Sequence, residues 1–173
     1  MTAKQESIIN AALKLFATEG YASTSTSKVA KSAGVSEGLI FRHFNSKEGL
    51  LNAILEKSAE AARVMMANVV ISSEPNDVIR KLLELPYNIR KEEYEMWRLT
   101  YALKWQTDSY DTSIYDPLRH AVNNAFSKLG YNDPEAETEI IMMLMDGAAT
   151  AFLLHEPNNK NDVLNALKSK YNL

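Results

Sequence analysis

Apolar residues recur at helical spacing along almost the whole chain, and proline interrupts that pattern at few points. No proline precedes Pro75, and the other four are Pro86, Pro117, Pro134 and Pro157. Proline breaks or opens a helix because it lacks a backbone N–H. We therefore expect helices over residues 3–19, 25–33, 37–43, 46–71, 75–88, 91–108, 112–129, 134–155 and 160–171. Long strand-like alternation and Asn-Gly or Asp-Gly hairpin signals are missing, so the predicted fold class is all-α.

The charge of the chain is divided unevenly along its length. Residues 1–47 contain six Lys and Arg against three Asp and Glu, a net charge of +3. Residues 48–173 contain 13 basic against 19 acidic residues, a net charge of −6. A basic head on an acidic body is typical of a protein that binds a polyanion at one end, although many solvated surfaces carry as large an excess.

The 173-residue sequence contains no cysteine, which excludes a disulfide framework and a thiolate metal site. The first residues lack a basic region followed by an apolar stretch, so we expect no secretory signal. The longest uninterrupted apolar run is Ile140–Met145, far short of a membrane span. We expect a soluble, cytoplasmic protein that uses no membrane, metal or cofactor.

The predicted helices over 25–33 and 37–43 meet at the small residues Ala33 and Gly34. Two short helices joined by such a turn form the skeleton of a helix-turn-helix, whose second helix enters the major groove of DNA. Polar groups at helix starts, here Thr26, Ser36 and Lys47, are suited to phosphate contacts. The same pattern also suits an ordinary corner in a helical bundle, so the spacing alone leaves both interpretations open.

Residues 12–21 read Ala-Leu-Lys-Leu-Phe-Ala-Thr-Glu-Gly-Tyr, and residues 29–51 read Val-Ala-Lys-Ser-Ala-Gly-Val-Ser-Glu-Gly-Leu-Ile-Phe-Arg-His-Phe-Asn-Ser-Lys-Glu-Gly-Leu-Leu. This string resembles the N-terminal signature of TetR-family transcriptional repressors over roughly residues 5–55. The resemblance implies a three-helix DNA-binding head at 1–47 and a larger helical effector-binding and dimerisation domain at 48–173. It also implies a homodimer that binds a near-palindromic operator in double-stranded DNA and is released by a small apolar or amphipathic molecule.

The resemblance also implies which residues contact DNA. These are Thr26, Ser27, Lys28, Ser36, Glu37, Gly38, Leu39, Phe41, Arg42, His43 and Lys47. Phe41 stands where the family most often has tyrosine, so a phosphate hydrogen bond is lost and contact with sugar or a thymine methyl is expected. Arg42 is suited to phosphate or guanine. Glu37 either accepts from a cytosine amine or serves the helix N-terminus as an acidic first-turn residue.

The body contains four aromatic residues at successive steps of three, four and four, which share one helix face: Tyr94, Trp97, Tyr101 and Trp105. We predict an effector site from these and neighbouring residues: Tyr87, Tyr94, Trp97, Tyr101, Trp105, Met142, Met145 and Asp146. The alternative for the aromatic and methionine residues is a place in the core or at a dimer contact. Asp146 interrupts an apolar run and is expected to meet a ligand cation, a neighbouring Arg or Lys, or solvent.

Two predicted helices offer apolar faces for dimerisation. The first, 112–129, carries Ile114, Leu118, Val122, Ala125, Phe126 and Leu129, and the second, 134–155, carries Ile140, Ile141, Leu144, Ala148, Ala151, Phe152 and Leu153. Two such helices from each subunit would form a four-helix interface. This placement follows largely from the family resemblance.

An enzyme is a rival class. His43, His120 and His155 are far apart in sequence, and no metalloprotease, dinucleotide-binding, phosphate-loop or nucleophile-elbow motif occurs. We therefore predict no enzymatic activity. A helical protein-interaction adaptor without effector binding is the alternative function, although it leaves the polar residues at the helix starts of the head unexplained.

Overall fold

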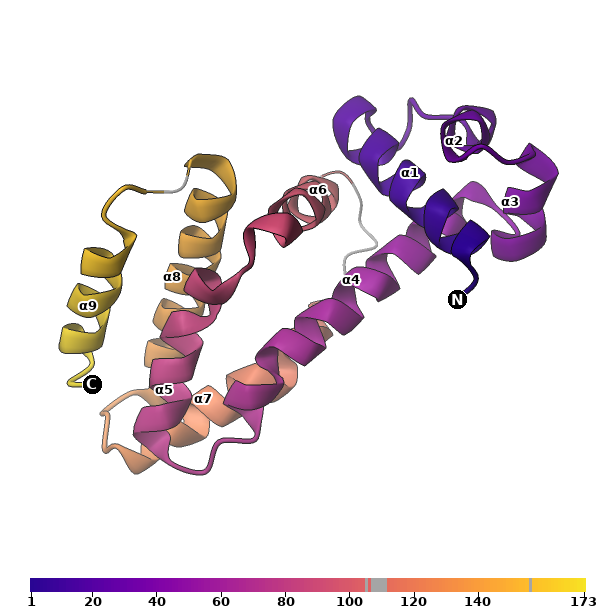
Figure 1. The fold of residues 1–173 in the computed structure, drawn as a ribbon. Helices are drawn as coiled ribbons and strands as arrows, with labels where there is room; N and C mark the ends of the chain where they lie inside the picture. The colour runs from indigo at the N-terminus through magenta and orange to yellow at the C-terminus, as the bar shows by residue number, and fades with distance from the viewer. Residues whose placement is uncertain (105, 107–111, 156) are drawn as a thin grey trace. The chain divides into compact units, whose positions relative to one another are not determined.

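The computed structural model describes residues 1–104, 106, 112–155 and 157–173, and these residues form helices and connecting turns without a strand (Figure 1). The α-helices are α1 (Ala3–Glu19), α2 (Thr26–Ala33), α3 (Glu37–Phe44), α4 (Lys47–Val70), α5 (Pro75–Glu84), α6 (Tyr94–Lys104), α7 (Asp116–Lys128), α8 (Pro134–His155) and α9 (Lys160–Lys170). Short 3-10 helices are η1 (Leu85–Asn88), η2 (Lys91–Glu93) and η3 (Ser113–Tyr115). The predicted all-α fold is confirmed.

Most predicted helix boundaries agree with the structure to within a residue or two. The predicted helix 75–88 is α-helical only to Glu84 and continues as η1, because Pro86 has no N–H for the helical ladder. The predicted helix 91–108 begins with η2 and is α-helical to Lys104, and its residues 105, 107 and 108 lie outside the described residues. The predicted helix 112–129 likewise begins with a 3-10 turn before α7.

The chain divides into two compact units. The head unit comprises Met1–Glu60 and Glu95–Tyr110, and the body unit comprises Ala61–Tyr94 and Asp111–Leu173. The first part of α4 belongs to the head unit and its second part to the body unit. The head unit is therefore larger than the predicted domain 1–47, and it contains α6, which the sequence places in the effector-binding domain.

The core of the head unit draws on each of its helices. The side chains with no solvent exposure are Ile8, Ala12, Phe16, Val29, Ile40, Leu50 and Leu103. Leu103 brings α6 into this core, and the buried hydroxyls of Ser58 and Thr100 lie 3.1 Å apart between α4 and α6. Removal of this apolar surface from water is the main term that holds the helices together.

Gln106 attaches the segment after α6 to the end of α1. Its Nε2 donates to the carbonyl of Ala17 at 3.5 Å, and its Oε1 accepts from the backbone N–H of Tyr21 at 3.3 Å. One side chain thus satisfies two backbone groups where a helix leaves its last carbonyls unpaired. The α6 segment is held to the head unit by polar as well as apolar contacts.

Two glycines determine how α2, α3 and α4 follow one another. Gly34 ends α2 with a φ of 67°, in the left-handed region that favours glycine. Gly49 lies at a close approach of the chain, since a Cβ there would stand 2.0 Å from the carbonyl oxygen of Phe44. Only glycine fits at residue 49 without a shift of the end of α3.

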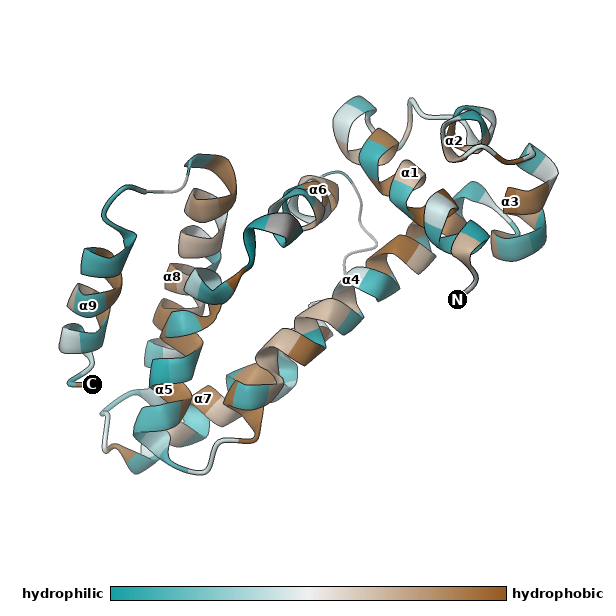
Figure 2. Ribbon diagram, viewed as in Figure 1, coloured by the Kyte–Doolittle hydropathy of each residue, from teal (hydrophilic) through white to brown (hydrophobic). Residues whose placement is uncertain are grey.

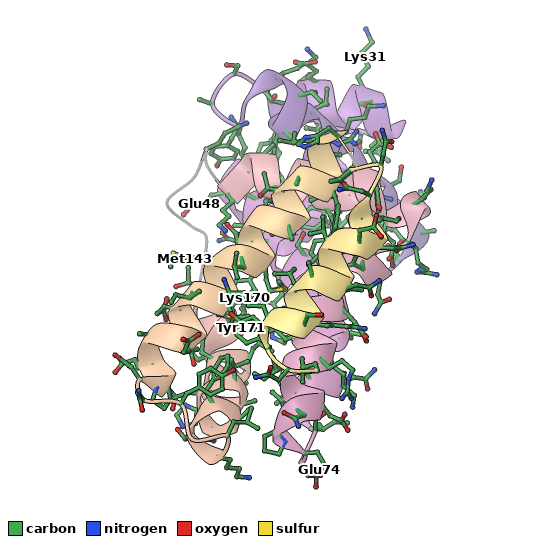
Figure 3. The ribbon with its side chains drawn as sticks, turned by 90° about the vertical axis from the view of Figure 1, so that its left-hand side faces the viewer. Lys31, Glu48, Glu74, Met143, Lys170 and Tyr171 are labelled. Carbon is green, nitrogen blue, oxygen red and sulfur yellow. The ribbon has the colours of Figure 1, made fainter. Side chains whose placement is uncertain are left out.

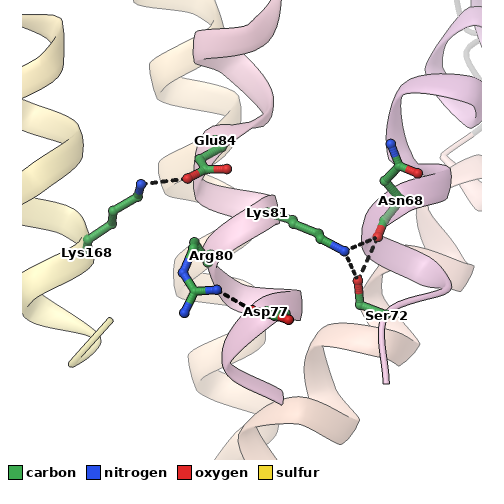
Figure 4. Close-up of polar contacts among 7 residues, drawn as sticks. All are labelled: Asn68, Ser72, Asp77, Arg80, Lys81, Glu84 and Lys168. Atoms are coloured by element: carbon green, nitrogen blue, oxygen red, sulfur yellow. Dashed lines mark hydrogen bonds and ion pairs between the residues drawn. The ribbon is translucent and has the colours of Figure 1, made fainter. Parts of the chain in front are cut away.

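In the body unit, α7 packs against both α5 and α8, and α9 packs against α5. Figure 4 shows the polar contacts beside these helices. Lys168 Nζ lies 2.6 Å from the Glu84 carboxylate and joins α9 to α5. Lys81 Nζ donates to Ser72 Oγ at 2.7 Å and to the carbonyl of Asn68 at 3.4 Å, which ties α5 to the end of α4.

The apolar face of α7 is used inside the body unit. Four of the six residues predicted to form a dimer surface there are 3% exposed or less, namely Leu118, Val122, Ala125 and Phe126. The prediction of that surface is wrong for these four residues, because α5 and α8 already cover the face that carries them.

α8 carries apolar residues on both a buried and an exposed face. Ile141 is fully buried, whereas Ile140, Met143 and Leu154 are 42%, 64% and 67% exposed. Figure 2 shows the hydrophobic colour concentrated toward the C-terminal end of this helix. By length and composition alone α8 would suit a membrane span, with a mean hydropathy of 1.2 and 28% of that window buried. This is weak evidence, because a helix that packs against α7 passes the same test.

Candidate nucleic-acid interface

α2 and α3 form the helix-turn-helix, and α2 also packs against α1. Ser25 caps α2, since its side chain accepts from the backbone N–H of Lys28 at 3.2 Å. Ser36 precedes α3 and is exposed, but it makes no side-chain capping bond. The Ser36 hydroxyl and the first N–H groups of α3 are therefore open to an acceptor such as a phosphate.

A hydrogen bond joins the first residues of the two helices. The half-buried Thr26 begins α2 and the exposed Glu37 begins α3. Thr26 Oγ1 donates to the Glu37 carboxylate at 2.6 Å. The sequence predicts DNA contacts for both residues but not this bond, because they lie 11 positions apart and only the fold brings them together. The bond occupies the one proton of the Thr26 hydroxyl.

The predicted cations of the interface differ in how available they are. Arg42 is exposed and makes no hydrogen bond or ion pair with any described residue. Lys28 pairs with Glu19 of α1 and remains 52% exposed. Lys47 is half-buried, and its Nζ donates to the carbonyl of Ala22 at 3.2 Å. Arg42 is the cation of these three that meets a ligand without losing an existing contact.

Lys47 also holds the loop that follows α1. Its Nζ lies 4.5 Å from the centre of the Tyr21 ring, a cation–π distance. Burial, together with the negative charge of Glu48, raises the pKa of the Tyr21 phenol. An ammonium has three protons, so the contact with Ala22 leaves two for a phosphate. Lys47 thus combines a structural contact with the predicted DNA contact.

The remaining predicted contacts are partly or fully accessible. Ser27 and Gly38 are exposed, and Phe41 is 45% exposed despite its apolar ring. Leu39 is half-buried against the core of the head unit. His43 is also half-buried, with its Nδ1 3.5 Å from Nε2 of Gln5. The structure thus presents Phe41 outward, as apolar contact with DNA requires.

Three further cations of the head unit are absent from the predicted contacts. Lys4, Lys14 and Lys31 are exposed and form no ion pair with any residue in the described part of the chain. Figure 3 shows Lys31 projecting away from the helices. The basic excess of residues 1–47 indicates that such cations exist, but a net charge does not show in which direction their side chains point.

Comparison with known proteins bears directly on this helix-turn-helix. Residues 8–54 match the family described as "Bacterial regulatory proteins, tetR family". Residues 8–54 therefore carry the N-terminal domain of the TetR family. The resemblance drawn from roughly residues 5–55 is confirmed, and the matched segment contains α2 and α3 in full.

Curated relatives of this chain are themselves described as regulators. The HTH-type transcriptional regulator YerO of Bacillus subtilis is 29% identical over 127 residues, which cover 62% of this chain and 44% of that protein. The HTH-type transcriptional regulator YuxN of the same organism is 36% identical over 88 residues, covering 50% of this chain and 30% of that protein. The chain thus spans less than half the length of these relatives.

Solved structures resemble the whole chain. A TetR-like transcriptional regulator from Rhodococcus sp. RHA1 has a TM-score of 0.79 at 18% identity and covers 99% of this chain and 96% of its own. A transcriptional regulator from Saccharomonospora viridis, solved in complex with choline, has a TM-score of 0.70 at 19% identity and covers 95% and 93%. At these identities the likeness establishes the fold alone.

The residues predicted for the effector site do not fall in one compact unit. Trp97 and Tyr101 belong to the head unit, and Trp105 lies outside the described residues. The others lie in the body unit: Tyr87, Tyr94, Met142, Met145 and Asp146. Trp97 is 8% exposed. The predicted set is therefore divided between the two units, with Trp105 outside the described residues.

Tyr87 is the predicted effector residue with the most unusual surroundings. Its ring packs edge-on against Phe152 of α8, with ring centroids 4.7 Å apart. Its hydroxyl is buried without a hydrogen-bond partner among the described residues, and burial raises the pKa of the phenol. Met145 is buried, whereas Asp146 is exposed at the edge of α8.

Proposed function

We propose that this TetR-family protein is a transcriptional repressor. It binds a near-palindromic operator as a homodimer and is released by a small apolar or amphipathic molecule. The observation that carries the proposal is the accessible surface of α3, which combines the open Ser36 hydroxyl, the outward Phe41 ring and the unpaired Arg42 guanidinium. Such a regulator works on chromosomal DNA in the cytoplasm.

This surface suits DNA because its groups divide between affinity and selectivity. A hydroxyl and uncapped N–H groups at the start of α3 suit phosphate oxygens, which position a protein without reading sequence. Arg42 suits the paired acceptors of guanine, a contact worth about 1–3 kcal/mol of discrimination between bases. The basic excess of residues 1–47 adds attraction to any duplex, and that attraction weakens as salt rises.

The exposed face of α8 supports the homodimer. Met143, Leu144 and Leu154 follow Ile140 by three, four and fourteen residues, which places them on one side of the helix, and Gly147 between them is exposed. Large apolar side chains left in water on one helix face are typical of an association surface. A two-fold pairing through α8 would present two heads to successive major-groove faces of an operator.

The unsatisfied hydroxyl of Tyr87 supports effector binding in the body unit. A buried polar group without a partner costs roughly 1–3 kcal/mol, and a ligand that supplies the partner recovers that free energy. The packing of Tyr87 on Phe152 adds an aromatic wall for an apolar ligand. The choline complex of the Saccharomonospora viridis regulator gives one small molecule for a first ligand screen.

In vitro selection of bound duplexes from a random pool tests the DNA-binding half of the proposal. We expect an inverted-repeat site whose affinity, measured by fluorescence anisotropy, falls steeply with salt. A protein-interaction adaptor would give no enriched sequence and no salt-dependent binding, and that result would refute the proposal.

A ligand screen tests release. We expect a compound that raises the melting temperature of the protein to lower its affinity for the selected operator, because ligand and DNA favour different conformations. Tyr87→Phe, which removes only the hydroxyl, should weaken that compound's binding and leave operator affinity without ligand unchanged. A compound that stabilises the protein yet leaves operator affinity equal is not an inducer, and failure of every stabilising compound would overturn the release mechanism.

A further inference from the structure

The hydrogen bond between Thr26 and Glu37 conflicts with the DNA contacts that each residue is expected to make. It joins the first residue of α2 to the first residue of the recognition helix α3 at 2.6 Å. A bond from a hydroxyl to an ionised carboxylate is about twice as strong as one between neutral groups. Thr26 has no second proton, so it donates either to Glu37 or to a phosphate.

Breaking this bond leaves Glu37 without a donor. When an acceptor enters an interface without a hydrogen-bond donor, the free energy lost with its bound water is not recovered. The phosphates of the duplex add like-charge repulsion to that cost, since Glu37 is exposed on the same two-helix surface. The free energy gained when Thr26 donates to a phosphate is therefore offset unless the DNA itself supplies Glu37 with a new donor.

Every base pair offers one amine donor in the major groove, cytosine N4 or adenine N6, but adenine sets its N7 acceptor beside that amine. The cytosine N4 amine is the donor that Glu side chains accept from, whereas guanine presents two acceptors and thymine an acceptor and a methyl group. A cytosine beneath the start of α3 would satisfy Glu37 and free the Thr26 hydroxyl for the phosphate. Guanine or thymine there would leave one of the two side chains without its bond, and adenine would place its N7 acceptor against the carboxylate.

We propose that Glu37 is a specificity-determining residue of this helix-turn-helix. Its carboxylate keeps the Thr26 hydroxyl from a phosphate unless a cytosine amine replaces that hydroxyl as the donor to Glu37. The inference rests on the proposed DNA-binding function. It differs from a simple helix-dipole role for Glu37, which would stabilise α3 to the same extent on every DNA sequence.

The test compares the duplexes selected by the full-length wild-type protein with those selected by Glu37→Gln. Wild type is expected to require cytosine at one position of each half-site and to bind roughly 10-fold more weakly when that cytosine is replaced. Glu37→Gln is expected to shift the preferred base at that position to adenine, because a glutamine amide pairs with adenine N6 and N7. Non-cognate duplexes should bind the variant more tightly than wild type.

Glu6→Gln is the matched control. Glu6 is an exposed carboxylate of the same unit, 3.5 Å from Lys57 and remote in sequence from α2 and α3. It changes the net charge by the same amount, so it measures the general effect of removing one negative charge. An equal gain in affinity on all duplexes for both variants, with the preferred base unchanged, would overturn the inference.

Thr26→Val in the wild-type and Glu37→Gln backgrounds tests the coupling of the two residues. In the wild-type background, loss of the hydroxyl should weaken binding to the cytosine-containing site several-fold more than binding to a non-cognate duplex. Equal losses on both duplexes would show that Glu37 does not withhold the hydroxyl. If wild type enriches no sequence at all, the proposed DNA-binding function fails; if it enriches a site that Glu37→Gln reads identically, only this inference fails.

Discussion

The exposed face of α3 in the head unit and the exposed face of α8 in the body unit show two different kinds of surface. On α3 the accessible groups are a hydroxyl, a carboxylate, a guanidinium and one aromatic ring, from Ser36, Glu37, Arg42 and Phe41. On α8 they are mainly long apolar side chains, of which Met143 is 64% exposed. A polar face of this kind suits a partner that offers directional hydrogen bonds, whereas an apolar face suits a partner of matching shape.

That difference fits the extent of the family match. The family model matches residues 8–54, which include α2 and α3, and none of α5 to α9. Contacts with bases and phosphates need particular functional groups at particular positions. A buried helix face accepts many combinations of apolar residues of suitable volume, so its sequence is far less constrained.

Phe16 and Phe41 give the sharpest contrast between core and surface. Phe16 is fully buried, and Phe16→Ala is expected to lower the free energy of unfolding by about 3–5 kcal/mol through lost burial and the cavity left behind. Phe41 is 45% exposed, so Phe41→Ala should cost less than about 1 kcal/mol while weakening operator binding. Chemical unfolding followed by circular dichroism measures both. Equal destabilisation by the two variants would contradict the assignment of Phe41 to the surface.

Met143→Glu tests the apolar face of α8. A carboxylate at the centre of an apolar association surface is left without a partner, and we expect dimer affinity to fall by roughly 100-fold or more. Light scattering coupled to size-exclusion chromatography measures the mass. Val163→Glu introduces the same group at a 41% exposed site on α9 and should leave the dimer intact. A dimer that survives Met143→Glu would place the interface elsewhere.

Arg42→Ala tests the polar face of α3. Its guanidinium has no partner within the described structure, so its removal should lower operator affinity by about 1–3 kcal/mol and leave the melting temperature unchanged. Arg80→Ala removes the same charge from the body unit and should leave operator affinity almost unaffected. If Arg42→Ala unfolds the protein instead, Arg42 belongs to the framework of the head unit.

Lys47→Met is expected to affect both the stability of the head unit and its binding to DNA. It keeps most of the apolar stem but removes the bond to Ala22 and the charge over Tyr21, so we expect a loss of about 1 kcal/mol in unfolding free energy. Operator affinity should fall as well. Lys14→Met removes an exposed charge that forms no ion pair in the described part of the head unit, and thermal unfolding should not distinguish it from wild type. Similar melting temperatures for both variants would show that the Ala22 and Tyr21 contacts add nothing.

The smallest expected effect concerns Glu93 in the body unit. Hydrogen bonds from Arg90 hold the pKa of Glu93 below its usual value of 4.5. A lowered folded-state pKa stabilises the protein above the unfolded-state value, and this contribution disappears as the pH falls through the folded-state pKa. We expect Glu93→Gln to cost a few tenths of a kcal/mol at neutral pH. A difference that persists unchanged at about pH 3 would exclude this linkage.

Much of the fold was predictable from local signals. Helical spacing and the positions of the prolines predicted the course of every α-helix, because each helix buries a stripe of its own residues. The 3-10 turn at Leu85–Asn88 was not predicted, since a proline near a helix end is compatible with either a continued or a tightened turn. The inclusion of α6 in the head unit depends on Leu103, which is part of the head core, and on Gln106, whose hydrogen-bond partners lie 85 and 89 residues away in sequence.

The site was predictable in its residues but less so in their contacts. The resemblance located Thr26, Glu37 and Lys47 at the starts of helices, and each is the first residue of its helix in the structure. It did not predict that Thr26 is bound to Glu37 or that Lys47 is bound to Ala22. Both are contacts between side chains and distant segments, and they follow from the angles at which helices meet.

The missing side chain of Gly49 has a consequence for any effort to redirect this protein to new DNA. Substitutions on α3 change which groups reach a base, but a Cβ at residue 49 would stand 2.0 Å from the carbonyl oxygen of Phe44 and would force the end of α3 to shift. The position of the recognition helix therefore depends on the absence of a Cβ at residue 49. A substitution at residue 49 would move the end of α3, whereas substitutions at Glu37 or Arg42 would change only the chemical groups that face the DNA.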